Sequence, residues 1–413
     1  MKNVSKEIQE APVFEMGMLD RLAREGAARI LMETMDAEVV AYLGRLPYAR
    51  SEKFRGYRNG YAKRRTIAVG LGSVEVHPPR VRDVPPDVEE FQSQILGRYQ
   101  RMSVETRNLL AELYLEGLSS GDFEPLFRHL LGENTPLSPA SIIRLKEDWQ
   151  SEYETWKKRP LEKRYAYTWG DGVYLKVGPK NDKTAILVVI GVTEDGQKDL
   201  LAIVEGYRES KESWSGLLRD LRERGVEEIL FFAGDGHLGI WPALDEVFPK
   251  AKHQRCWNHK VLNVLDKLPK RLWPEVKKEL RNIWKAETEA ECRAQADKYS
   301  KRLRLMGQAK AAETLLRDFD DLVTFYHFPK EHWVHLRTTN PIESVFAGVR
   351  LRTNVAKRMR TQETALYLVF KIIQRLSINW RAINSPDLVS FVLAGRVFKN
   401  GILQEEEVAR LAA

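Results

Sequence analysis

Three acidic residues that are far apart in the sequence have the settings expected of a site for divalent cations. Asp171 interrupts a β-rich run (YTWGDGVYLKV), Asp235 ends another (EEILFFAGDG), and Glu343 opens a predicted helix (TTNPIESVFAGVRLR). Carboxylates that converge in one cleft repel each other, and bound cations relieve that repulsion. Mg²⁺ prefers a few carboxylates with waters and phosphate oxygens, and two such ions can assist phosphoryl transfer. The three acids therefore predict a catalytic site with two Mg²⁺ ions, for which Mn²⁺ can substitute.

Each acid also has a local structural explanation. Asp171 and Asp235 both precede a glycine, and Asp-Gly is a strong turn signal. Glu343 lies three residues after Asn340, with Pro341 between them, and so fits the start of a helix with a capping box. For each acid alone, the structural role is at least as good an explanation as a catalytic role. The three acids together, in the right order of elements, favour a catalytic role.

The elements around these acids alternate between strand and helix. Alternating or continuous apolar runs predict strands, and a 3.6-residue apolar period predicts helices. We expect strands over 166–177, 184–193, 199–208 and 227–235, helices over 213–225 and 239–248, and one further short strand within 252–260. Three antiparallel strands, a helix, a fourth strand and more helices is the order of an RNase H-like core. In that α/β topology the first and fourth strands are neighbours, so Asp171 and Asp235 would lie side by side, and a helix crossing the sheet can bring Glu343 to them.

The region before this core is basic. Residues 16–46 have helical apolar spacing, and residues 53–82 carry eight Lys or Arg against one acid, Glu75, with strand-like alternation around a turn at Gly70 to Gly72. A basic hairpin of this kind can lie along a phosphate backbone or be a solvated surface. The candidate DNA contacts are Arg55, Arg58, Lys63, Arg64 and Arg65.

Residues 103–150 are again helical, with polar breaks. Ser138 is a predicted N-cap, and Pro139 stands at the first helical position. Helix, break, helix, break and capped helix fits a helix-turn-helix reader of DNA, although three-helix segments without that function are common.

A second basic segment follows Glu343. It holds Arg350, Arg352, Lys357 and Arg358 and no acid, so it predicts contacts with phosphates near the catalytic site, the alternative being a solvated face.

Cys256 and His259 form a Cys-x-x-His pair between the second and third acids. A structural zinc site needs four ligands, usually in two pairs, and no second pair is present. We interpret Cys256 and His259 as structural support near the catalytic site, with zinc binding or DNA contact by His259 as the alternatives.

Composition sets the broader limits. The chain has 413 residues, a net charge of +8 and two cysteines, which favours nucleic acid as a partner and excludes a disulfide framework. No apolar run reaches the roughly 18 residues of a membrane span, and the first residues lack a signal-peptide core. We expect a cytoplasmic protein without membrane contact.

At these residues the sequence resembles the Mutator-like transposases of bacterial insertion sequences, a family of DDE transposases. The similarity covers about residues 20–385, and its most specific part is HQRCWNHKVLNVLDKLPK; DGVYLKV, FFAGDGHLGI and TTNPIESVFAGVRLRTN also match. Gly172 departs from the residue that many relatives carry after the first Asp.

The resemblance implies DNA transposition. The enzyme would bind the terminal inverted repeats of its own element, water would free a 3′-hydroxyl, and that hydroxyl would attack target DNA. The positions of Asp171, Asp235 and Glu343 carry over as catalytic metal ligands, and we expect a homodimer or higher multimer. A nuclease without strand transfer and a non-catalytic DNA-binding protein are the alternatives.

The resemblance also implies an all-helical insertion between the second Asp and the Glu. We therefore expect six regions: a helical and basic hairpin region (1–100), a helix-turn-helix-like region (101–160), the first part of the catalytic core (161–260), the insertion (261–335), the second part of the core with the Glu-bearing helix (336–385) and a tail (386–413).

Overall fold

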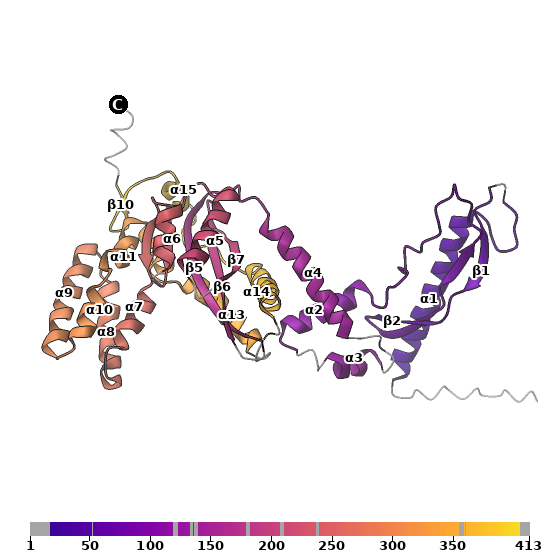
Figure 1. Ribbon diagram of the computed structural model, residues 1–413, viewed down its shortest axis with the longest axis horizontal. Coiled ribbons are helices and arrows are strands. Elements are labelled where there is room, and N and C mark those ends of the chain that lie inside the picture. Colours follow the sequence, from indigo (N-terminus) through magenta and orange to yellow (C-terminus); the bar gives the residue numbers. More distant parts are fainter. Residues whose placement is uncertain are drawn as a thin grey trace, which may run out of the picture. The chain divides into compact units, whose positions relative to one another are not determined.

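The chain divides into two compact units, Met1–Leu145 and Lys146–Ala413, in the computed structural model shown in Figure 1. The structure describes residues 17–51, 53–118, 123–132, 135, 139–178, 182–206, 210–236, 239–354, 359 and 361–404.

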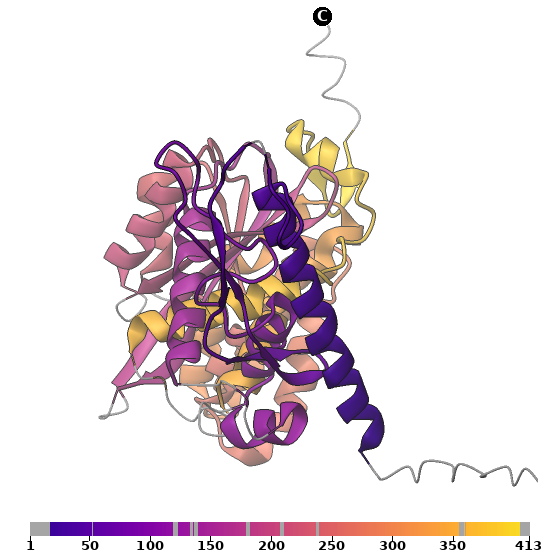
Figure 2. The ribbon, with the colours of Figure 1, turned by 90° about the vertical axis from the view of Figure 1, so that its right-hand side faces the viewer.

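The first unit is built around one long helix and two pairs of strands. Helix α1 (Met18–Leu43) ends at Gly44, whose φ of 64° is the left-handed conformation typical of a helix stop. It lies beside the strands (Figure 2) and packs against β3 and β4. Strand β2 (Arg65–Val69) forms an antiparallel hairpin with β3 (Gly72–Val76), as predicted, and β1 (Tyr57–Tyr61) pairs with β4 (Pro79–Arg82). The core between helix and strands comprises Met35, Ile67, Val74, Val76 and Leu96.

Three helices follow in the chain, as the spacing predicts. Helix α2 (Val104–Leu115) is capped by Ser103, whose hydroxyl accepts a hydrogen bond from the Thr106 N–H. Helix α3 (Phe123–Leu131) comes next, and α4 (Pro139–Lys157) begins at the predicted proline. The predicted cap, Ser138, lies outside the described residues. The helix-turn-helix assignment stays a prediction.

The second unit contains a mixed five-stranded sheet with the order β7-β6-β5-β8-β9. Strand β5 (Tyr165–Val177) pairs antiparallel with β6 (Asp182–Thr193), which pairs antiparallel with β7 (Lys198–Gly206). On its other side β5 runs parallel to β8 (Phe231–Gly234), and β8 runs parallel to β9 (Lys252–Arg255). The predicted strands are all present, and the expected contact between the first and fourth strands is confirmed.

Both faces of the sheet are covered, which explains the long apolar runs. Alternate residues of β6 (Ala185, Leu187, Val189) join a core with helices α5 (Lys211–Glu223) and α6 (Ile240–Val247). The residues between them, such as Val188, are equally buried, and helices α13 (Asn340–Thr353) and α14 (Gln362–Ser377) contact strands of this sheet. A strand that is buried on both sides reads as a continuous apolar run, as β6 does.

The segment between β9 and α13 is helical, as its pattern predicts. Its helices pack on each other, α10 on α7 and α9, and α8 on α7 and α9. The elements are α7 (Trp257–Leu265), α8 (Trp273–Trp284), α9 (Glu289–Leu305), α10 (Ala309–Leu316), α11 (Phe319–Val323) and α12 (Trp333–Leu336), with 3₁₀ turns at Lys270–Leu272, Thr324–His327 and Lys330–His332.

The C-terminal region, which carries no clear sequence pattern, contains short elements. Helix α15 (Leu388–Leu393) packs against β5, and β10 (Phe398–Lys399) pairs with β11 (Ile402–Leu403). Among the described helices, none combines the length and apolar character required to cross a membrane.

Candidate active site

The sheet brings the two aspartates to one level. Asp171 lies inside β5, so the turn suggested by its following glycine does not form there. Asp235 directly follows β8, and Gly236 after it has a φ of 85°, a left-handed conformation that favours glycine. Trp169 of β5 is level with Ala233 of β8. Asp171 and Asp235 each stand two residues further along the chain from this level pair.

Glu343 reaches the same place from the first turn of α13, a helix that packs against β5. The N-cap of this helix is Thr339, one residue before the expected start, so a capping box between Asn340 and Glu343 is not formed. Instead, the Thr339 hydroxyl donates a hydrogen bond of 2.6 Å to Oε1 of Glu343. Thr339 thereby fixes the carboxylate, a role that the sequence reading missed although Thr is a preferred N-cap residue.

All three acids line one hollow of about 260 Å³. Its other lining residues are Gly172, Tyr174, His259 and Arg350. The hollow thus collects three carboxylates from two strands and one helix, with one guanidinium at its wall. The Gly172 N–H donates a 2.7 Å hydrogen bond to Asp171, which helps to orient that carboxylate.

Cys256 connects the segment of Asp235 to the helix of Glu343. Its backbone N–H donates to the carbonyl of Gly234, the residue before Asp235, at 2.8 Å. Its buried sulfur accepts hydrogen bonds from the N–H and the hydroxyl of Thr339 at 3.3 and 3.2 Å. Burial raises the pKa of the Cys256 thiol to about 11. His259, three residues on, has Nδ1 3.7 Å from Oε1 of Glu343.

Arg255 packs closely against Gly236, the residue after Asp235. An added Cβ at Gly236 would lie 2.6 Å from Nε of Arg255, whose guanidinium is bonded to Asp318. Glycine is therefore favoured here, both for its positive φ and for its close contact with Arg255.

We expect the Gly236→Ala variant to lose the DNA-cutting activity that the sequence resemblance implies by between about tenfold and 10²-fold, because moving Asp235 disturbs the positions of reacting groups. The measurement is the initial rate of DNA cutting in Mg²⁺, together with the thermal midpoint. Gly307→Ala is the matched control, since Gly307 has a φ of 73° but no atom within 4 Å of an added Cβ. If both variants lose activity equally, the contact with Arg255 has no role in the site.

Comparison with known proteins decides the family. The model of the family described as "Transposase, Mutator family" matches residues 2–383 of the 413-residue chain. The chain belongs to the Mutator family of transposases. Transposases cut and join DNA, so DNA is the substrate class that this membership gives.

The relatives of this transposase family include proteins of several bacterial insertion sequences. The chain is 44% identical to the transposase for IS6120 of Mycolicibacterium smegmatis over 298 residues, which cover 72% of this chain and 92% of that protein. It is 40% identical to the transposase for IST2 of Acidithiobacillus ferrooxidans, over 66% of this chain and 93% of that protein. For the transposase for ISRM5 of Rhizobium meliloti the identity is 30%, over 88% of this chain and 91% of that protein.

The basic residues predicted to contact DNA have different surroundings. Arg55, Lys63 and Arg64 are exposed, and Arg64 lies 3.6 Å from Glu75. Arg58 lies 3.9 Å from Asp36. The guanidinium of Arg65, in contrast, donates to the carbonyls of Arg98 and Gly97 at 2.5 and 3.2 Å and so has a role in the fold of its own unit.

The second basic segment is described only in part. Arg350 is exposed and lines the acidic hollow, with its guanidinium 5.9 Å from the ring centre of Phe346. Arg352 lies in the last turn of the same helix. Lys357 and Arg358 are outside the described residues.

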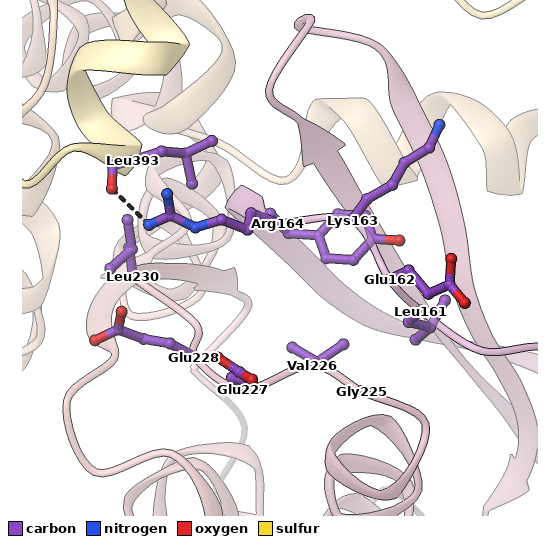
Figure 3. Close-up of a pocket in the computed structure, with 11 residues that line it drawn as sticks. Leu161, Glu162, Lys163, Arg164, Gly225, Val226, Glu227, Glu228, Leu230 and Leu393 are labelled. Atoms are coloured by element: carbon purple, nitrogen blue, oxygen red, sulfur yellow. Dashed lines mark hydrogen bonds between the residues drawn. The ribbon is translucent and has the colours of Figure 1, made fainter.

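A larger hollow, of about 350 Å³, lies where the chain enters β5 (Figure 3). Charged residues of both signs line it, among them Glu162, Lys163 and Glu228. Arg164 at its edge donates to the carbonyl of Leu393 at 2.6 Å, so it holds α15 in place.

Proposed function

We propose that this chain binds the terminal inverted repeats of its own insertion sequence, cleaves DNA strands there and transfers the ends to target DNA. The single observation that supports this chemistry is the hollow lined by Asp171, Asp235 and Glu343. We assign these three residues as the catalytic metal ligands. Their convergence from distant parts of the chain has no evident structural purpose, because repulsion among grouped carboxylates opposes folding.

The three carboxylates of the hollow are the kind of ligands that two Mg²⁺ ions would take. Carboxylates, waters and phosphate oxygens are the ligands that Mg²⁺ prefers, and Mn²⁺ accepts the same oxygen ligands. When bound, such ions would activate the attacking oxygen and stabilise the leaving one. The hydrogen bond from Thr339 then presents one oxygen of Glu343 in a fixed direction, and the Gly172 N–H does the same for Asp171.

Water is the first nucleophile in the proposed reaction and leaves a free 3′-hydroxyl. That hydroxyl then attacks a phosphate of the target DNA, and the displaced oxygen leaves as a new hydroxyl. Arg350 is placed to pair with a phosphate at the hollow, because a guanidinium donates two parallel hydrogen bonds to such a group. Cys256 and His259 support the site by joining the segment of Asp235 to that of Glu343.

We also propose an RNase H-like core interrupted by a helical insertion. The strand order β7-β6-β5-β8-β9, with three antiparallel strands and two further parallel ones, supports this assignment. The helical elements between β9 and α13 correspond to the insertion, expected over 261–335. We propose the six regions expected from the sequence as the domain organisation of the chain.

The exposed basic residues of the first unit are assigned to DNA binding. These residues lie in or beside the first strands and are Arg55, Arg58, Lys63 and Arg64. Arg65 is also assigned to DNA binding, in addition to its structural hydrogen bonds. In the second unit the assigned residues follow the start of the Glu-bearing helix and are Arg350, Arg352, Lys357 and Arg358. Pairing of two element ends requires more than one active site, so we propose a homodimer or higher multimer. We propose that it acts in the cytoplasm, where its DNA substrate would lie.

The decisive experiment incubates the purified chain with a DNA fragment that carries one element end, a target plasmid, and either Mg²⁺ or Mn²⁺. We expect cutting at the end of the repeat and covalent joining of the 3′-end to the plasmid, both absent in EDTA. Cutting without joining, under conditions that permit both, would assign the chain as a nuclease. Binding of the end with neither reaction would assign it as a non-catalytic DNA-binding protein.

A further inference from the structure

A sulfur, an imidazole and a carboxylate meet at one edge of the acidic hollow. One ligand atom from each of Cys256, His259 and Glu343 lies within 4.8 Å of the other two. Sulfur and nitrogen ligands are not those that Mg²⁺ selects; they are the ligands of Zn²⁺ and chemically similar ions. This group therefore has a different metal preference from the pair of aspartates beside it.

The sulfur of Cys256 is surrounded by hydrogen-bond donors. The N–H and hydroxyl of Thr339 donate to it. The Thr339 hydroxyl has one hydrogen and is also 2.6 Å from Glu343, so the two acceptors compete for it. Donors of this kind hold the sulfur in a fixed position, as hydrogen bonds around metal ligands do.

The imidazole of His259 supplies the second observation. Its Nδ1 is buried, has no hydrogen-bond partner among the described residues, and faces Oε1 of Glu343 at 3.7 Å. A buried ring nitrogen without a partner is costly, and a metal ion would satisfy it. Tetrahedral ligands of zinc stand roughly 3.5 Å apart, so small side-chain rotations suffice to close the three around one ion.

We propose that Cys256, His259 and Glu343 form a binding site for one borderline-soft divalent cation, with Zn²⁺ as the representative ion. Three protein ligands leave a fourth position open to water, as in zinc sites that are not purely structural. Glu343 is shared with the proposed Mg²⁺ site, so occupancy by Zn²⁺ withdraws this carboxylate from the Mg²⁺ ions. This inhibitory consequence rests on the proposed function, whereas the binding itself does not.

Binding is tested with Co²⁺ as the probe, on the full chain without an affinity tag and without DNA. We expect a sulfur-to-cobalt charge-transfer band that saturates at one ion per chain and that Zn²⁺ displaces. The Cys256→Ser variant loses this band, and His259→Ala weakens Co²⁺ binding by at least about tenfold. Because no cleavage is measured, failure of this site is distinguishable from failure of the proposed function.

Cys292→Ser is the matched control, since Cys292 is the other cysteine and is equally buried. It should keep both the band and the affinity, and circular dichroism should show that each variant is folded. A band that persists in Cys256→Ser or disappears in Cys292→Ser would place the ion elsewhere. Absence of the band from the unaltered protein would also overturn the proposal.

Discussion

We expect the Asp235→Asn variant to lose DNA cleavage by about 10³-fold or more while it still binds the element's ends. A lost metal ligand removes several kcal/mol of transition-state charge stabilisation, and about 4 kcal/mol corresponds to this factor. Asn keeps the shape and one oxygen but carries no charge. Asp171→Asn and Glu343→Gln should behave in the same way, because the three acids line one hollow.

The stability of these variants separates catalysis from folding. Removing one of three grouped carboxylates relieves repulsion, so the thermal midpoint without Mg²⁺ should stay the same or rise. Asp266→Asn is the control: Asp266 is exposed at the end of α7 in the same unit and should tolerate the change with normal cleavage. Cleavage of end-labelled DNA, measured beside the thermal midpoint, separates a catalytic role of the acids from a role in folding. Retained cutting by the protein with all three acids replaced by Ala would remove the site assignment.

The second large effect concerns a buried lysine and pH. Lys260 on α7 is 1% exposed, and its Nζ donates to the carbonyl of Thr314 at 2.8 Å and to that of Arg317. These carbonyls lie in the last turn of α10 and just beyond it, where a donor satisfies groups that the helix leaves unpaired. Burial lowers the pKa of Lys260 to about 7, and the nearby charge of Arg255 acts in the same direction.

The sign of the pH dependence follows from this lowered pKa. Unfolded lysine has a pKa of about 10.4, so between about pH 7 and that value the unfolded chain binds a proton that the folded chain does not. The stability of the folded protein therefore rises with pH in this window, by about 1.4 kcal/mol per pH unit from this group. Below about pH 7 both states are protonated, and the contribution no longer changes.

The Lys260→Met variant lacks this proton and should lack this slope. We expect the stability difference between the unaltered protein and the variant to grow by about 4 kcal/mol from pH 7 to pH 10, in favour of the unaltered protein. Urea unfolding followed by tryptophan fluorescence measures it, since all ten tryptophans lie in the second unit. Lys267→Met, at an exposed position, should leave the slope unchanged. Parallel curves for the protein and Lys260→Met would mean that Lys260 stays charged across the window.

Much of the second unit could be predicted because its signals are local. The run TAILVVIGVT is almost continuously apolar. It forms β6, whose side chains are buried on both faces of the sheet. The amphipathic pattern of α5 ends at Arg224 and Gly225, the glycine having a φ of 113°. Such patterns specify an element before any long-range contact forms.

Other features could not be predicted because their cause is distant in the chain. Helix α13 begins at Asn340 behind Thr339, and the Thr339 side chain bonds Cys256, which lies 83 residues earlier. The same contact explains why Glu343 is oriented by a hydroxyl group and has no role in a capping box. Helix α15 has only six residues, too few for a periodic pattern. It is held in part by a hydrogen bond from Arg164, which lies much earlier in the sequence.

The sequence by itself determined which residues can bind cations, because the residue types at 171, 235, 256, 259 and 343 carry a carboxylate, a sulfur or an imidazole. It also determined the strands and helices that carry them, through apolar spacing. Only the tertiary structure decided that Asp171, Asp235, His259 and Glu343 line one hollow and that Cys256 lies beside Glu343. Parallel pairing of β5 with β8 and the packing of α13 on β5 join segments that are more than 60 residues apart. The physical reason is that spacing along the chain fixes which face of an element is apolar, whereas burial of those faces against each other fixes which polar groups become neighbours.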